Sequence, residues 1–117
     1  MITEYHFPTP VYIKEIPNAR ELNFYLEKNI LQWNKKDPKG VNKTNVNGWH
    51  STTDMNNKHE YDPLTKELFN MQLEIFKKEL LTEKPVLGNM WANINYPGGY
   101  NRPHLHPNSL FSGVYCA

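Results

Sequence analysis

The hydrophobic pattern of this chain changes from a helical period to a period of two, and this change limits the folds open to it. Apolar residues recur at helical spacing in segments 19–33 and 62–81. Segment 86–96 then alternates between apolar and polar residues, as expected for a half-buried strand. Helices that precede strands in this way favour an α+β fold in which two helices cover a small sheet.

The remaining segments complete the expected order of elements. Segment 7–16 is predicted to be an edge strand or a lead-in, because its two prolines have no N–H to donate to a ladder. Pro97-Gly98-Gly99 is predicted to be a turn, and segment 110–117 a final strand. Segment 34–61 is rich in turn residues, and a loop of this length is unusual unless it is functional or partly ordered by pairing.

Both predicted helices begin with residues that favour a helix start. Asn18 is the expected N-cap of the first helix, with Glu21 three residues on in an arrangement close to a capping box. Asp62 is the expected N-cap of the second helix, because Pro63 suits the first helical position.

Length and composition bound the kind of protein. The 117 residues suffice for a single domain, residues 1–117, with a modest core. A net charge of +1 argues against strong binding of nucleic acid or an anionic membrane. The one cysteine, Cys116, excludes an internal disulfide and is expected to be a small buried residue. No signal-peptide pattern or membrane-length apolar run is visible, so the cytoplasm, of a bacterium or of a phage host, is the expected compartment.

His104 and His106 carry the clearest chemical signal in the sequence. In extended chain, two imidazoles at this spacing project from the same face and can bind one metal ion. Neutral imidazole suits iron, zinc, copper or nickel, and Pro103 and Pro107 stiffen the segment. The alternative is a pair of surface loop histidines, because a His-x-His pair often arises by chance.

Asn93 and Asn95 lie on the polar face of the predicted strand, opposite its apolar face. Their amides can hold a carboxylate or carbonyl oxygen in a cavity, or they can form an ordinary exposed face. Tyr115 is grouped with them as a candidate cofactor-binding residue. The candidate pocket residues are Trp49, Trp91, Asn101, Ser109 and Ser112.

Several of these residues also have ordinary structural interpretations. Ser109 follows Asn108 and can be a turn residue, and Trp91 can belong to the core. Trp49, in the middle of the long loop, can plug the core or cover a pocket. The remaining histidines are expected to be solvated or idle: His6, His50 and His59.

Taken together, these motifs resemble a family of iron(II)/2-oxoglutarate-dependent oxygenases found in marine bacteria and their phages. The resemblance is most specific in four stretches: 90–95, 98–101, 104–109 and 112–115. Two earlier stretches support it: Phe7-Pro8-Thr9-Pro10 and Gly48-Trp49-His50-Ser51. It extends from about residue 7 to residue 115, which is nearly the whole sequence.

The resemblance implies a double-stranded β-helix, or jelly roll, with two helices packed outside it, of which residues 1–117 form the N-terminal part. It implies Fe(II) and 2-oxoglutarate as cofactors, and O₂ and an unidentified substrate as partners, in a hydroxylase-type reaction. His104 matches the first iron ligand, and His106 stands where a carboxylate is usual. Asn93 and Asn95 fall where 2-oxoglutarate contacts lie, with Asn95 in place of the usual tyrosine.

The resemblance also implies that residues 1–117 hold only part of a site. The distal histidine and the basic residue that pairs with 2-oxoglutarate come from later strands in the family. We therefore expect a homo-oligomer, a complementing chain or a further segment to complete the site, with weak or absent catalysis otherwise.

Two other functions remain open. One is a cupin-like metal-binding protein, because Gly98 precedes His104-x-His106 by five intervening residues, although the usual glutamate is missing. The other is a non-catalytic jelly-roll module, of phage origin, with a binding or structural role. The substrate class stays open, because specificity depends on loops and pockets that residue spacing does not reveal.

Overall fold

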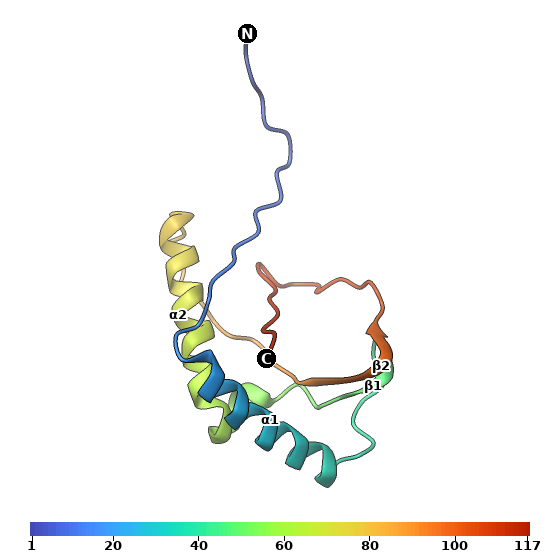
Figure 1. The fold of residues 1–117 in the computed structure, drawn as a ribbon. Coiled ribbons are helices and arrows are strands. Elements are labelled where there is room, and N and C mark those ends of the chain that lie inside the picture. Colours follow the sequence, from blue (N-terminus) through green and yellow to red (C-terminus); the bar gives the residue numbers. More distant parts are fainter.

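The computed structural model describes all 117 residues and shows an α+β fold. Figure 1 shows its two helices, α1 (Ala19–Lys36) and α2 (Asp62–Lys78), beside a two-stranded antiparallel sheet. The strands are β1 (Asn45–His50) and β2 (Asn93–Asn101). Two single-turn 3₁₀ helices, η1 (Met55–Asn57) and η2 (His59–Tyr61), lead from β1 into α2. The predicted α+β class is confirmed.

Both helices form where the periodicity predicted them, but their ends differ. Asn18 adopts a left-handed backbone (φ 57°) and makes no side-chain cap bond, so the predicted capping box is wrong. A side-chain cap needs an extended N-cap backbone, which Asn18 does not have. Helix α2 begins at Asp62 with Tyr61 as its N-cap, so the predicted N-cap, Asp62, is one position too late. The helix ends at Lys78, because Leu80 turns into left-handed backbone (φ 54°).

The sheet pairs two segments that the sequence did not join. Strand β1 lies within the segment expected to be irregular, which confirms that pairing orders part of that loop. Its partner β2 begins at Asn93, later than predicted, and includes the expected turn Pro97-Gly98-Gly99. Residues 96–99 lie opposite Asn47 alone, so this turn is an irregular bulge inside a strand. A Cβ on Gly99 would stand 2.3 Å from the Asn47 carbonyl oxygen, so the bulge requires glycine there.

The two terminal segments are extended but form no strand. Segment 7–16 is the lead-in of the two predicted alternatives, and Figure 1 shows its first part running away from the helices. Segment 110–117 has no backbone ladder partner, so the predicted final strand is wrong. Side chains alone hold it in place: Phe111 meets Tyr12 edge to face at 6.1 Å. Cys116 is exposed there, against expectation.

The core is small and lies between the helices and one face of the sheet. It has seven buried apolar residues from α1, β1, η1, η2, α2 and the chain entering β2: Leu26, Trp49, Met55, Tyr61, Leu64, Met90 and Ala92. The predicted alternation around Ala92 is confirmed, because Met90 and Ala92 are buried and Ile94 packs against the core. No helix combines the length and apolar character that a membrane span requires.

Candidate metal-binding site

The face of the sheet opposite the core carries the candidate site. Trp49 pairs in register with Ile94 on the core face, and His50 pairs with Asn93 on the other. Residues directly opposite each other in an antiparallel pair share a face, and the alternation along a strand adds every second residue. His50, Asn93 and Asn95 therefore lie on one face, and Trp91 precedes them with the same alternation.

His50 is buried, and the expectation that it is solvated is wrong. Only 4% of the residue is exposed, because the paired strand and the ring of Trp91 cover it. Its Nδ1 lies 2.6 Å from the backbone carbonyl oxygen of Ser51. A carbonyl oxygen only accepts hydrogen bonds, so Nδ1 carries a proton, and in the neutral ring Nε2 is then the nitrogen with the lone pair. The imidazole is thereby fixed in orientation and tautomer.

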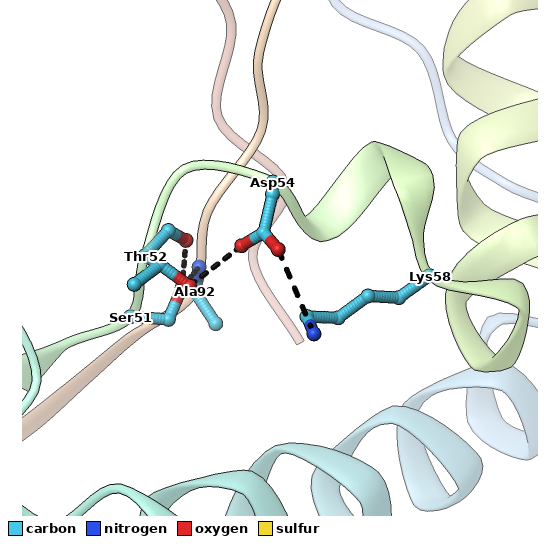
Figure 2. Close-up of polar contacts among 5 residues, drawn as sticks. All are labelled: Ser51, Thr52, Asp54, Lys58 and Ala92. Atoms are coloured by element: carbon cyan, nitrogen blue, oxygen red, sulfur yellow. Dashed lines mark hydrogen bonds and ion pairs between the residues drawn. The ribbon is translucent and has the colours of Figure 1, made fainter.

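Ser51 joins the end of β1 to the start of β2. Its backbone N–H donates to the Ala92 carbonyl at 3.0 Å, and its Oγ accepts from the Ala92 N–H at 3.0 Å. The same hydroxyl donates to the Thr52 carbonyl at 2.7 Å. Figure 2 shows Ser51, Thr52 and Ala92. Ser51 is fully buried and bonds to both backbone polar groups of Ala92, the residue next to Trp91.

The loop after Ser51 is held by a chain of polar contacts, also drawn in Figure 2. The Thr52 hydroxyl donates to the Asp54 carboxylate at 2.6 Å, and Lys58 Nζ lies 3.7 Å from the other carboxylate oxygen. The hydrogen bond from Thr52 holds the pKa of Asp54 below its ordinary value, with Lys58 adding to the effect. These contacts fix the path of the chain from the site into η1.

Four aromatic rings continue outward from this base, and we call them the aromatic stack: His50, Trp91, His106 and His104. The His50 and Trp91 rings are nearly parallel, with centroids 5.4 Å apart and planes 13° apart. His106 is also stacked on Trp91, with centroids 5.6 Å apart and planes 29° apart. His104 then meets His106 edge to face at 4.7 Å. The stack runs from the buried His50 through two half-buried rings to the exposed His104.

The spacing of the His104 and His106 rings is compatible with a shared transition-metal ion. Two imidazoles on one ion, with metal–nitrogen bonds of about 2.1 Å, have ring centres about 4.5–5.2 Å apart at octahedral to tetrahedral angles. The observed 4.7 Å lies in that range. Nδ1 of His104 lies 2.7 Å from the Arg102 carbonyl oxygen and must donate to it, which leaves Nε2 free for a metal. Histidine ligands of metals are commonly oriented in this way.

The asparagines expected to bind a cofactor lie along the same face. Asn93 and Asn95 are both exposed on β2. The side-chain amide of Asn95 donates to Oδ1 of Asn101 at 3.4 Å, which brings one candidate pocket residue to this face. The amide of Asn93 makes no side-chain hydrogen bond within the protein and is free to meet a ligand.

The other sequence candidates lie outside this cluster. Trp49 belongs to the core, where its indole N–H donates to the Asp37 carbonyl at 2.8 Å. The Tyr115 hydroxyl donates to Asn23 of α1 at 2.5 Å, so its proton is committed to the helix. Ser109 is a turn residue whose N–H donates to the His106 carbonyl, and Ser112 is exposed.

The histidines elsewhere contrast with the stack. The His59 side chain is 99% exposed, as expected, and lies 3.3 Å from Asp62. His6 lies exposed beside Glu4. His50 is thus the one residue of this cluster whose burial the sequence analysis missed. Its segment, Asn45–His50, shows no alternation of apolar and polar residues, because Val46 and Trp49 fall at positions of opposite parity, so no local pattern predicted the strand.

No group of three or more His, Cys, Asp or Glu side chains is placed to hold a metal ion. The candidate donors are therefore limited to the pair His104 and His106, and imidazole is a ligand that suits divalent transition metals. Comparison with protein-family models, curated proteins and solved structures found no match. The site has to be judged on its own geometry.

Proposed function

We propose that this protein is an Fe(II)/2-oxoglutarate-dependent oxygenase of the hydroxylase type, in which His104 and His106 bind the iron. One observation carries the proposal: the two rings lie 4.7 Å apart, with His104 held by Arg102 in the tautomer that leaves Nε2 free. The similarity of the surrounding motifs to that oxygenase family selects iron among the metals that imidazole binds.

The proposal includes the fold of the family. Strands β1 and β2, with α1 and α2 on their core face, are compatible with part of a double-stranded β-helix. In this proposal the remaining metal positions are filled by water, by a second copy or by a complementing chain.

Each residue of the face has a distinct task in the proposed site. Bound iron would supply oxygen activation together with 2-oxoglutarate, which is chemistry that protein side chains lack. His104 and His106 hold the ion at one edge of the sheet. The free amide of Asn93 donates to a carboxylate or carbonyl oxygen of 2-oxoglutarate, and Asn101 orients the amide of Asn95 for the same purpose.

The test is an anaerobic titration of the purified protein with Fe(II), followed by 2-oxoglutarate, monitored by calorimetry and visible absorption. We expect binding of one Fe(II) per chain and a charge-transfer band that appears only when both components are present. The double variant His104→Ala/His106→Ala should lose both signals. His59→Ala is the matched control, because that side chain is 99% exposed and lies outside the stack.

Each other outcome supports a different function. Metal binding without any effect of 2-oxoglutarate would favour the cupin-like alternative and refute the oxygenase. Equal metal affinity in the wild type and in the double variant would refute the site itself. The non-catalytic module would then be the better account of the chain.

A further inference from the structure

Trp91 is stacked with two imidazoles. Its ring centroid lies 5.4 Å from that of His50, with the planes 13° apart, and 5.6 Å from that of His106, with the planes 29° apart. Trp91 is also a candidate pocket residue, and these two contacts indicate a second role for it, as the ring that links His50 to His106.

One end of this arrangement is fixed to the body of the protein. His50 is 4% exposed and its Nδ1–H is bonded to the Ser51 carbonyl. Ser51 in turn is hydrogen-bonded to both the N–H and the carbonyl of Ala92, the residue that follows Trp91. Trp91 is therefore restrained by its backbone on one side and by the His50 ring below it.

The two proposed metal ligands are oriented by different means. The His104 ring is fixed by a hydrogen bond to the Arg102 carbonyl oxygen, the usual device for a histidine ligand. The His106 ring has no hydrogen-bond partner within the protein, and its ring contacts are a stacked one with Trp91 and a T-shaped one with His104. Stacking on Trp91 thus orients the His106 ring, as the hydrogen bond to Arg102 orients the His104 ring.

We propose that Trp91 is a positioning residue for metal binding: held by His50, it orients the His106 ring toward the ion that His104 also binds. This inference rests on the proposed metal site and adds two residues, Trp91 and His50, that do not touch the metal. Coordination draws electron density from the His106 ring. The electron-rich indole face therefore attracts the ligated ring more strongly than the free one.

The experiment compares Ni(II) affinity, measured by calorimetry, in the wild type, Trp91→Phe and Trp91→Leu. Phenylalanine keeps a flat ring on which His106 can stack, whereas leucine keeps only apolar bulk. We expect Trp91→Leu to weaken Ni(II) binding about tenfold, within the range for residues that orient a ligand. Trp91→Phe should stay within about threefold of the wild type, because most of the stacking area is kept. Tyr100→Leu, at an exposed aromatic on β2, is the matched control and should not change the affinity.

A second measurement detects the stack without any metal. In the metal-free protein, the ring protons of His106 should show the upfield NMR shift that an adjacent indole face produces. Trp91→Leu should remove this shift, while the amide spectrum of the core remains that of the folded protein.

The outcomes separate this inference from the proposed function. If the wild type binds Ni(II) and Trp91→Leu binds it equally well, Trp91 does not position His106 although the metal site stands. If Trp91→Phe is as weak as Trp91→Leu, stacking is not the cause and the inference also fails. If the wild type binds no Ni(II), the metal site is refuted and the positioning role with it.

Discussion

Replacing Ser51 by alanine tests whether the base of the site is held as the structure shows. Ser51 is fully buried, and its Oγ accepts the hydrogen bond of the Ala92 N–H at 3.0 Å while donating to the Thr52 carbonyl at 2.7 Å. Alanine removes the hydroxyl and keeps the backbone. The Ala92 N–H is then left buried without an acceptor, whereas the Thr52 carbonyl belongs to an exposed residue and can bond to water.

The size of the effect follows from this asymmetry. A buried donor without its partner costs about 1–3 kcal/mol, and an exposed carbonyl that exchanges its partner for water costs far less. We therefore expect Ser51→Ala to lower the free energy of unfolding by about 2 kcal/mol. For a domain of this length, that loss corresponds to a decrease of about 8 °C in Tm.

Urea denaturation and thermal melting of the wild type, Ser51→Ala and Ser112→Ala measure the effect. Ser112 is the matched control, because it is exposed and its side chain makes no hydrogen bond within the protein, so its loss should stay within about 0.5 kcal/mol. An unchanged m-value would show that the denatured state is the same in all three proteins. If Ser51→Ala and Ser112→Ala had the same urea midpoint, the Ala92 N–H would not depend on Ser51, and the reasoning would be wrong.

Three further predictions concern the scaffold. Gly40→Ala should lower the free energy of unfolding by about 3 kcal/mol in the same urea assay, because φ is +52° and the added Cβ would stand 2.3 Å from a carbonyl oxygen. Gly88 has open space around it, so Gly88→Ala should change that free energy by no more than about 1 kcal/mol. Burial raises the pKa of Tyr61 from 10.0 to about 12, so the stability from its neutral form is fully present below pH 10 and is lost as the pH rises toward 12. Urea melts at each pH should therefore show that Tyr61→Phe loses less stability than the wild type over this range. Leu26→Ala should lower the free energy of unfolding by about 2–5 kcal/mol and Leu105→Ala by less than about 0.5 kcal/mol, because Leu26 is 1% exposed and Leu105 is 87% exposed. Equal urea midpoints for the two variants would place Leu26 outside the core.

The helices could be predicted because their signal is local. Leu22, Leu26 and Ile30 repeat at helical spacing, and the structure packs all three at the core. The ends were harder to predict, because they depend on backbone conformations that sequence propensity does not fix. Asn18 and Leu80 both adopt left-handed backbone, and Leu80 is a residue type that rarely does so.

The sheet could not be predicted, because its pairing joins segments far apart in the sequence. Asn47 and Gly98 belong to segments predicted to be turns from their residue types, and both adopt the left-handed backbone typical of turn residues, with φ values of 50° and 78°. Their arrangement was wrong, because they lie on opposite strands of one bulge instead of closing separate turns. Turn chemistry specifies a local conformation, and a bulge satisfies it as well as a hairpin does.

The candidate site divides in the same way. His104 and His106 are neighbours in the sequence, so their proximity follows from spacing alone. His50 comes close to them only because β1 pairs with β2 and because Trp91 lies between the rings. These tertiary contacts leave no local pattern in the sequence, so His50 was predicted to be a solvated loop residue.

The order of burial along the aromatic stack explains how a segment without secondary structure can hold His106, the proposed metal ligand, in place. Residues 102–109 have no ladder partner along most of their length, and binding sites on loops are less well fixed than sites on strands. Here the restraint reaches the loop through side chains: His50 is bonded within the sheet, Trp91 lies on His50, and His106 lies on Trp91. Since each ring limits the next, loss of the buried end should loosen the exposed end. The pairing of β1 with β2 therefore also restrains His106, the proposed metal ligand.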